Sequence, residues 1–71
     1  MRKLLITGAG GRIGKVVCPP LAREWDLRCG YSNERGRQAI EAMGLNSVSC
    51  DITDRAQVGE AVRGVDAILH M

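Results

Sequence analysis

Apolar residues in this chain occur in short runs that alternate with segments of helical spacing. The run at residues 4–6 stops at Thr7-Gly8 and predicts a strand buried on both faces of a parallel sheet. Three weaker runs predict further strands over 27–31, 46–50 and 66–70. This alternation of strands with helical segments is typical of an α/β fold.

The first helical segment begins near Arg12, directly after a glycine-rich turn. Its apolar residues recur at helical spacing and are expected to form one inward-facing stripe: Ile13, Val16, Val17, Leu21 and Ala22. Proline lacks an amide donor and clashes with the preceding turn, so Pro19-Pro20 should kink or shorten this helix.

Two further helices are predicted from their capping residues and apolar positions. The second, over 34–43, should bury Ile40 and Met43 and end at Gly44. The third should start at Thr53 or Asp54 and end at Gly64. Its inward residues are expected to be Val58, Ala61 and Val62.

Right-handed crossovers between these strands predict a doubly wound, Rossmann-like parallel sheet with three helices and strand order 3-2-1-4. We expect residues 1–71 to form one half domain, truncated after the fourth strand, with the catalytic and substrate-binding region absent. That strand reaches Met71 without a helix to cover it and without a partner on its outer edge. The edge is a candidate for pairing with a second copy of the chain.

Composition narrows the choice of partners. The chain is 45% hydrophobic and 25% charged with a formal net charge of +2, which is usual for a water-soluble domain. Neither a nucleic-acid surface nor a membrane partner is indicated, and a cytoplasmic location is expected. Three cysteines without metal-type spacing, Cys18, Cys29 and Cys50, are predicted to be inert buried thiols, and no metal site is expected.

The candidate chemistry lies in the glycine-rich turn over 7–14. Gly8 would form the tight turn, Gly11 would let the backbone approach a phosphate, and Gly14 would let the helix pack closely. The first helical turn, with Arg12 and Ile13, would present unpaired amides and the positive end of the helix dipole to a pyrophosphate. Its position between a strand and a helix predicts dinucleotide binding.

Two related motifs fit this turn less well. The spacing G-x-G-x-x-G would require glycine at Ile13, whereas G-x-x-G-x-x-G is satisfied. A P-loop is nearly matched by Gly14-Lys15, but Val16 stands where a hydroxyl must hold magnesium.

Taken with the pair after the third strand and with the fourth strand itself, this motif resembles the extended short-chain dehydrogenase/reductases, the NAD-dependent epimerase/dehydratase group. The further matching residues are Asp51-Ile52 and the segment 66–70. The resemblance implies that Asp51 accepts a hydrogen bond from the adenine amine, that Ile52 packs on the ring, and that His70 lies beside the cofactor. Asp51-Ile52 is open to a second interpretation, a turn that caps the following helix.

The same resemblance bears on the choice between NAD and NADP. The family's acidic residue for the ribose hydroxyls falls at Ser32, which cannot pair with both of them. Donors that could hold a 2′-phosphate favour NADP: Arg12, Asn33, Arg35 and Arg37. Glu34, two residues on, could serve NAD if the strand register differs, and the arginines could instead be solvated helix charges.

The Tyr-x-x-x-Lys pair that carries catalysis in the resembled family does not occur in these residues, because Tyr31 is followed by Arg35. The leading hypothesis is therefore the NAD(P)-binding part of an oxidoreductase or sugar epimerase/dehydratase, not catalytic alone. The alternatives are a non-catalytic NAD(P)-sensing module and a structural or assembly module.

Overall fold

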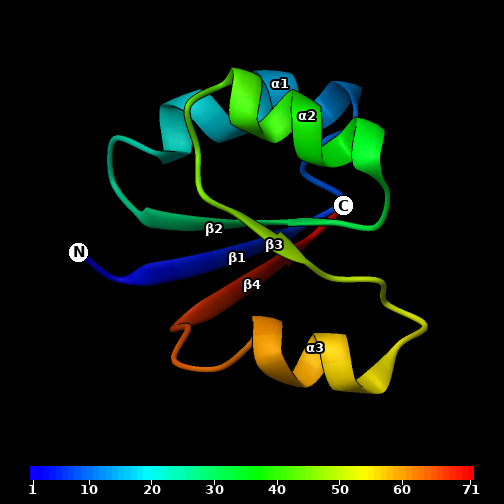
Figure 1. The fold of residues 1–71 in the computed structure, drawn as a ribbon. Coiled ribbons are helices and arrows are strands. Elements are labelled where there is room, and N and C mark those ends of the chain that lie inside the picture. Colours follow the sequence, from blue (N-terminus) through cyan, green and yellow to red (C-terminus); the bar gives the residue numbers. More distant parts are fainter.

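The four strands form one parallel sheet in the order β3-β2-β1-β4, as predicted (Figure 1). The computed structural model describes residues 1–71. The strands are β1 Lys3–Thr7, β2 Asp26–Tyr31, β3 Ser47–Ser49 and β4 Ala67–His70. The helices are α1 Arg12–Leu21, α2 Glu34–Ala42 and α3 Arg55–Ala61.

The sheet is covered on both faces, with α1 and α2 on one side and α3 on the other (Figure 1). Side chains alternate along β1, so Leu4 and Ile6 join the core beneath α1 and α2, while Leu5 joins Cys50 and Ala61 beneath α3. The chain therefore has two small cores separated by a central strand that is buried on both faces, as the unbroken apolar run predicts.

The inward face of α1 differs from the predicted stripe. Gly14 and Cys18 are the buried residues of this helix, whereas Ile13 is 64% exposed and Val16 is 74% exposed. Because Gly14 lies against the Ala9 carbonyl, it fixes the rotation of α1 about its axis. The helix therefore packs mainly through Gly14 and Cys18, with the predicted Leu21 and Ala22 partly buried against the core, whereas Ile13 and Val16 face outward.

The predicted helix ends are largely confirmed. Asp54, not Thr53, caps α3 by accepting hydrogen bonds from two backbone amides. Gly44 and Gly64 follow α2 and α3 with φ of 74° and 75°, as expected of C-terminal glycines. The helix α1 continues through both prolines and ends at Leu21.

One side-chain bridge connects the sheet to α3. The Arg28 guanidinium, from β2, donates to the carbonyl oxygens of Ala61 at 2.8 Å and Arg63 at 2.7 Å. These carbonyls lie at the end of α3, where backbone acceptors lack helical partners and the helix dipole favours a cation. Arg28 therefore ties the C-terminal end of α3 to β2.

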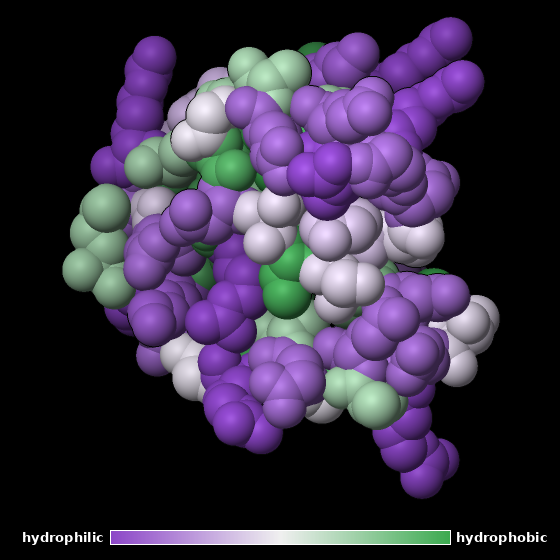
Figure 2. Space-filling view, in the orientation of Figure 1, coloured by the Kyte–Doolittle hydropathy of each residue, from purple (hydrophilic) through white to green (hydrophobic).

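The face shown in Figure 2 is mostly hydrophilic, with hydrophobic atoms visible between the two helical layers. The outer edge of β4 has no partner strand in the sheet, and its side chains Ile68 and Leu69 are 54% and 37% exposed. No helix of the structure combines the length and the apolar character needed to cross a membrane.

Candidate functional site

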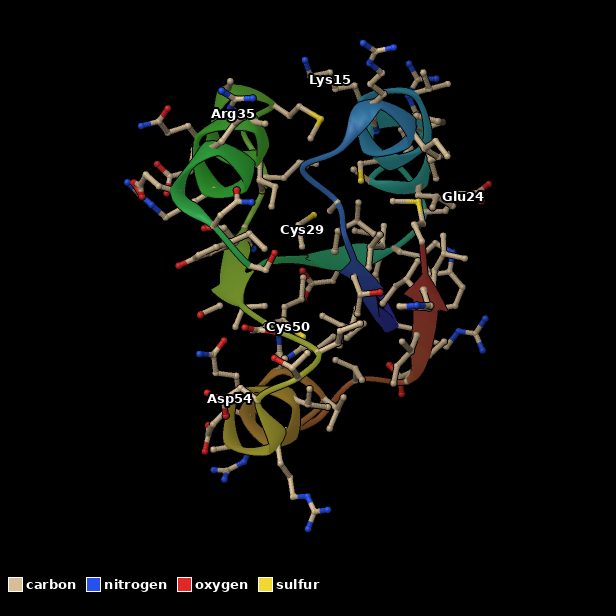
Figure 3. The ribbon with its side chains drawn as sticks, turned by 90° about the vertical axis from the view of Figure 1, so that its right-hand side faces the viewer. Lys15, Glu24, Cys29, Arg35, Cys50 and Asp54 are labelled. Carbon is tan, nitrogen blue, oxygen red and sulfur yellow. The ribbon has the colours of Figure 1, made fainter.

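Two adjacent clefts open where the strands end at their carboxyl termini, the side of the molecule that faces the viewer in Figure 3. The first is about 260 Å³ in volume and lies between the glycine turn and the start of α2. The second, about 150 Å³, lies between the ends of β1 and β4 and the segment after β3. Gly8 and Ser32 line both clefts, which therefore adjoin one another.

The first cleft brings together five of the predicted site residues. These are Gly8, Gly11, Ser32, Asn33 and Arg35. Four residues that the sequence analysis did not assign to the site also line it: Gly10, Gly30, Tyr31 and Gly36. The cleft walls are thus mostly bare backbone, with the polar side chains gathered at the α2 end.

The glycine turn leaves several amides free at the start of α1. Within the protein the amides of Arg12, Ile13 and Gly14 make no hydrogen bond, whereas Gly11 N–H donates to the Gly8 carbonyl at 3.2 Å. Gly8 has a backbone φ of 70°, a value that residues other than glycine rarely adopt. The turn therefore leaves unpaired donors at the positive end of a helix.

The two predicted glycines of the turn differ in what surrounds them. A Cβ at Gly14 would lie 1.8 Å from the Ala9 carbonyl oxygen, so this position is closed by the fold. A Cβ at Gly11 would meet only the Gly8 carbonyl oxygen, at 3.5 Å, which is an ordinary contact. Nothing in the protein itself demands glycine at position 11.

A contact between Gly10 and Gly36 joins the glycine turn to α2. A Cβ at Gly10 would lie 2.5 Å from the Gly36 Cα and 2.7 Å from its carbonyl oxygen. The backbone of the turn therefore touches the backbone of the first turn of α2. The sequence signal was a glycine within a predicted helix, since glycine is unfavourable there unless packing requires it.

The second cleft contains the predicted adenine-contact residues and His70. Asp51 and Ile52 line it, and Ile52 is 62% exposed. Asp51 Oδ1 accepts hydrogen bonds from the Thr53 amide at 2.9 Å and hydroxyl at 2.7 Å, which lower the pKa of the carboxyl. The helix cap is Asp54, so Asp51 stabilises the turn before α3 and does not cap the helix.

A hydrogen bond crosses the floor of the second cleft between neighbouring strands. Thr7 Oγ1, on β1, lies 2.6 Å from Nδ1 of His70, on β4. The contact fixes the orientation of the His70 ring beside Gly8. Cys50 also lines this cleft, and burial raises the pKa of its thiol, which keeps it protonated.

The charged residues near Ser32 have separate environments. Arg35 lines the first cleft, and Asn33 Oδ1 accepts a hydrogen bond from the Gly36 amide at 2.8 Å as the cap of α2. Arg37 was predicted as a phosphate donor, but its guanidinium is bound to the carboxylates of Glu34 and Glu41 and does not line the cleft. Arg37 also lowers the pKa of Glu34.

Three predicted residues line neither cleft: Arg12, Ile13 and Gly14. Arg12 and Ile13 are exposed in the first turn of α1, while Gly14 is buried against the turn. What they offer a ligand is backbone amides and, for Arg12, an exposed guanidinium.

The fold and the clefts define a class of protein. A glycine turn between the first strand and the first helix, with a cleft at the point where the strand order reverses, is the arrangement of doubly wound nucleotide-binding domains. The point of reversal here lies between β1 and β4.

Residues 4–71 match the model of the NAD dependent epimerase/dehydratase family, and the chain belongs to that family. The 2-alkyl-3-oxoalkanoate reductase of Shewanella oneidensis is 36% identical over 67 residues, which are 93% of this chain and 17% of that protein. The L-arabinose 1-dehydrogenase (NAD(P)(+)) of Haloferax volcanii is 32% identical, over 100% of this chain and 25% of that protein.

Solved structures have the same fold. An NADPH-dependent quinone oxidoreductase from Escherichia coli matches with a TM-score of 0.81 and 28% identity, over 94% of this chain and 26% of that one. Uronate dehydrogenase from Agrobacterium tumefaciens matches with a TM-score of 0.73 and 29% identity, over 100% of this chain and 26% of that one. The chain thus spans about a quarter or less of the length of these relatives.

Proposed function

We propose that the chain binds a nicotinamide dinucleotide across the two clefts and forms the cofactor-binding portion of an NAD(P)-dependent oxidoreductase or epimerase/dehydratase. The observation that carries the proposal is the pair of adjoining clefts, one at the β1–β4 switch point and the other between the glycine turn and α2, which share Gly8 and Ser32. A dinucleotide has two linked halves, and this crevice is where ligands bind in doubly wound sheets.

The pyrophosphate is assigned to the glycine turn. Support comes from the free amides of Arg12, Ile13 and Gly14 and from the open space at Gly11, where a side chain would come between a ligand and the backbone. Unpaired N–H groups and the helix dipole both favour an anion there.

The adenine is assigned to the second cleft. Asp51 Oδ1 is occupied by Thr53, which leaves Oδ2 to accept from the adenine amine, and the exposed Ile52 would cover the ring. His70 would lie beside the cofactor, held by Thr7.

The adenosine ribose is assigned to the α2 end of the first cleft, with NADP preferred to NAD. Ser32, Asn33 and Arg35 line that end, and Arg35 makes no ion pair there that would neutralise it. A guanidinium and a hydroxyl suit a 2′-phosphate, whereas a carboxylate would be needed to accept from both ribose hydroxyls. Arg12 is a further candidate for this phosphate.

When bound, the nicotinamide accepts or supplies a hydride. Residues 1–71 contain no Tyr-x-x-x-Lys sequence, so we assign them cofactor binding and expect no turnover from the chain alone. The resemblance to dehydrogenases and reductases supports hydride transfer as the chemistry of the whole enzyme.

The test is an equilibrium titration of the purified chain with NADPH and with NADH at fixed salt, followed by nucleotide fluorescence or calorimetry. Monodispersity is checked in the same sample by light scattering. We expect saturable one-to-one binding with NADPH tighter, and weaker binding of both nucleotides to the Ile52→Thr variant. A folded, monodisperse chain that binds neither nucleotide would refute the proposal.

A further inference from the structure

The first turns of α2 carry an ion-pair cluster that no part of the proposed function uses. Arg37 Nε lies 2.8 Å from each carboxylate oxygen of Glu34, and its Nη2 also donates to Glu34 Oε1. Its remaining terminal nitrogen, Nη1, donates to Glu41 Oε2 at 2.7 Å. Arg37 therefore binds two carboxylates at once through all three of its nitrogen atoms.

This cluster bears on the cleft because of where Glu34 stands in the chain. Its neighbours on both sides, Asn33 and Arg35, line the first cleft, but Glu34 does not. It is also the only carboxylate between residues 32 and 36. The acidic group of the segment that forms the proposed ribose site is thus held against Arg37, one helical turn further along α2.

We propose that Arg37 is a positioning residue for cofactor specificity, which keeps the Glu34 carboxylate out of the ribose end of the cleft. The inference rests on the proposed function. With Glu34 held away, a ligand meets the Ser32 hydroxyl and the Arg35 guanidinium. With Glu34 released, a carboxylate becomes available to accept from ribose hydroxyls and to repel a 2′-phosphate.

The geometry favours this role over a purely stabilising one. Glu34 and Arg37 side chains are 57% and 37% exposed, and exposed ion pairs contribute little to stability. A guanidinium that grips one carboxylate through two nitrogens is, however, directionally specific. The expected consequence of losing Arg37 is therefore a change in which nucleotide is preferred, with little change in folding.

The experiment compares dissociation constants for NADPH and NADH in the 71-residue chain and in Arg37→Met, Glu34→Gln and the double variant. Arg37→Met should lower the preference for NADPH by about two- to fivefold. The double variant should restore it to within about twofold of the unsubstituted chain, because Glu34 then has no charge to present. Arg37→Lys keeps the charge but not the two-nitrogen grip, and should resemble Arg37→Met.

The matched control is Arg63→Met, because Arg63 makes the same i,i+3 pair with Glu60 on α3, at 3.0 Å, and lines neither cleft. It removes one positive charge and should leave the preference unchanged. Circular dichroism of each variant checks that the helices are intact, and Arg37→Lys serves as the test if Arg37→Met is not folded.

The outcomes separate the two proposals. If the double variant stays as weak for NADPH as Arg37→Met, or if Arg37→Lys behaves as the unsubstituted chain does, then Arg37 acts on the phosphate by charge and the positioning role is wrong. An unchanged preference in Arg37→Met also overturns it. If the unsubstituted chain binds neither nucleotide, the proposed function itself has failed.

Discussion

Replacing Gly14 with alanine tests whether this residue closes the turn onto α1. The added Cβ would lie 1.8 Å from the Ala9 carbonyl oxygen, 2.6 Å from its carbonyl carbon and 3.1 Å from its Cα. An ordinary contact begins at about 3.4 Å, so the turn and the helix would have to separate. The obstacle is backbone and therefore cannot rotate away as a side chain could.

The expected cost is large relative to the stability of so small a domain. Alanine ordinarily stabilises a helix interior by about 1 kcal/mol over glycine, so the intrinsic effect opposes the clash. Overpacking costs about 1–3 kcal/mol and occasionally more, and because the obstacle here is backbone we take about 4 kcal/mol, which leaves a net loss of about 3 kcal/mol. The free energy of unfolding of 71 residues is about 4–10 kcal/mol, and Tm should fall by about 12–24 °C.

Gly11→Ala is the matched comparison, because its Cβ would meet only the Gly8 carbonyl oxygen, at 3.5 Å. Alanine is a poorer N-cap than glycine, so we expect a loss of up to about 1 kcal/mol in unfolding free energy. Its effect on the site should be greater, since the methyl group would stand between the pyrophosphate and the amides. We expect nucleotide affinity to fall about tenfold or more.

The assay is thermal unfolding by circular dichroism for both variants, with nucleotide titration of Gly11→Ala below its Tm. The expected pattern is a stability defect at Gly14 and a binding defect at Gly11. Equal Tm values for Gly14→Ala and the unsubstituted chain would show that the close approach to Ala9 is not a real constraint. Unchanged affinity in Gly11→Ala would refute the pyrophosphate assignment.

Two further predictions concern stability alone. Arg28→Met removes both hydrogen bonds to the carbonyls at the end of α3 and should lower the free energy of unfolding, measured in urea, by about 1–2 kcal/mol. The control Arg55→Met should change it by under about 0.5 kcal/mol. Equal losses in the two variants would contradict the role of the Arg28 bridge. Burial raises the pKa of Cys29 to about 12, so the folded state holds the thiol proton more tightly than the unfolded chain does. The stability that this provides is complete below about pH 9 and is lost as pH rises towards 12, by about 1.4 kcal/mol per pH unit. In urea unfolding, the free energy of unfolding of Cys29→Ala should therefore fall less steeply between about pH 9 and 10 than that of the unsubstituted chain.

The strand order and the layers could be predicted because each local signal agreed with the next. The unbroken apolar run at 4–6 required a strand buried on both faces, and the crossover rule then left one natural order for the other strands. Family membership followed from the turn at 7–14 and the Asp51-Ile52 pair, and it is confirmed over residues 4–71.

The orientation of α1 could not be predicted from hydropathy alone, because its fully buried residues are Gly14 and Cys18, and of the predicted stripe Leu21 and Ala22 pack against the core while Ile13 and Val16 are exposed. An analysis of periodicity gives most weight to the most hydrophobic side chains. Here, however, the distance between the helix and the glycine turn is set by Gly14, which has no side chain. That is why Ile13 and Val16 were expected inside and lie outside.

The pairing of Arg37 with Glu34 and Glu41 was equally hidden. Three candidate arginines, Arg12, Arg35 and Arg37, and the nearby Glu34 gave no indication of which charges would be neutralised, since i,i+3 and i,i+4 pairs compete with a ligand for the same guanidinium. The contact of Gly10 with Gly36 was missed because it joins two segments 26 positions apart whose only common signal is a missing side chain.

That contact has a consequence for redesign of the site. Gly10 lies directly on the backbone of Gly36, so no side chains separate the two walls of the first cleft, the glycine turn and the start of α2. Neither wall can therefore move inward by repacking of side chains. An engineer who exchanges Ser32 or Arg35 to alter the proposed nucleotide preference would therefore be working on a fixed backbone frame. Transplanting the whole loop from a relative would require glycine at both contact positions, or the frame itself would have to be rebuilt.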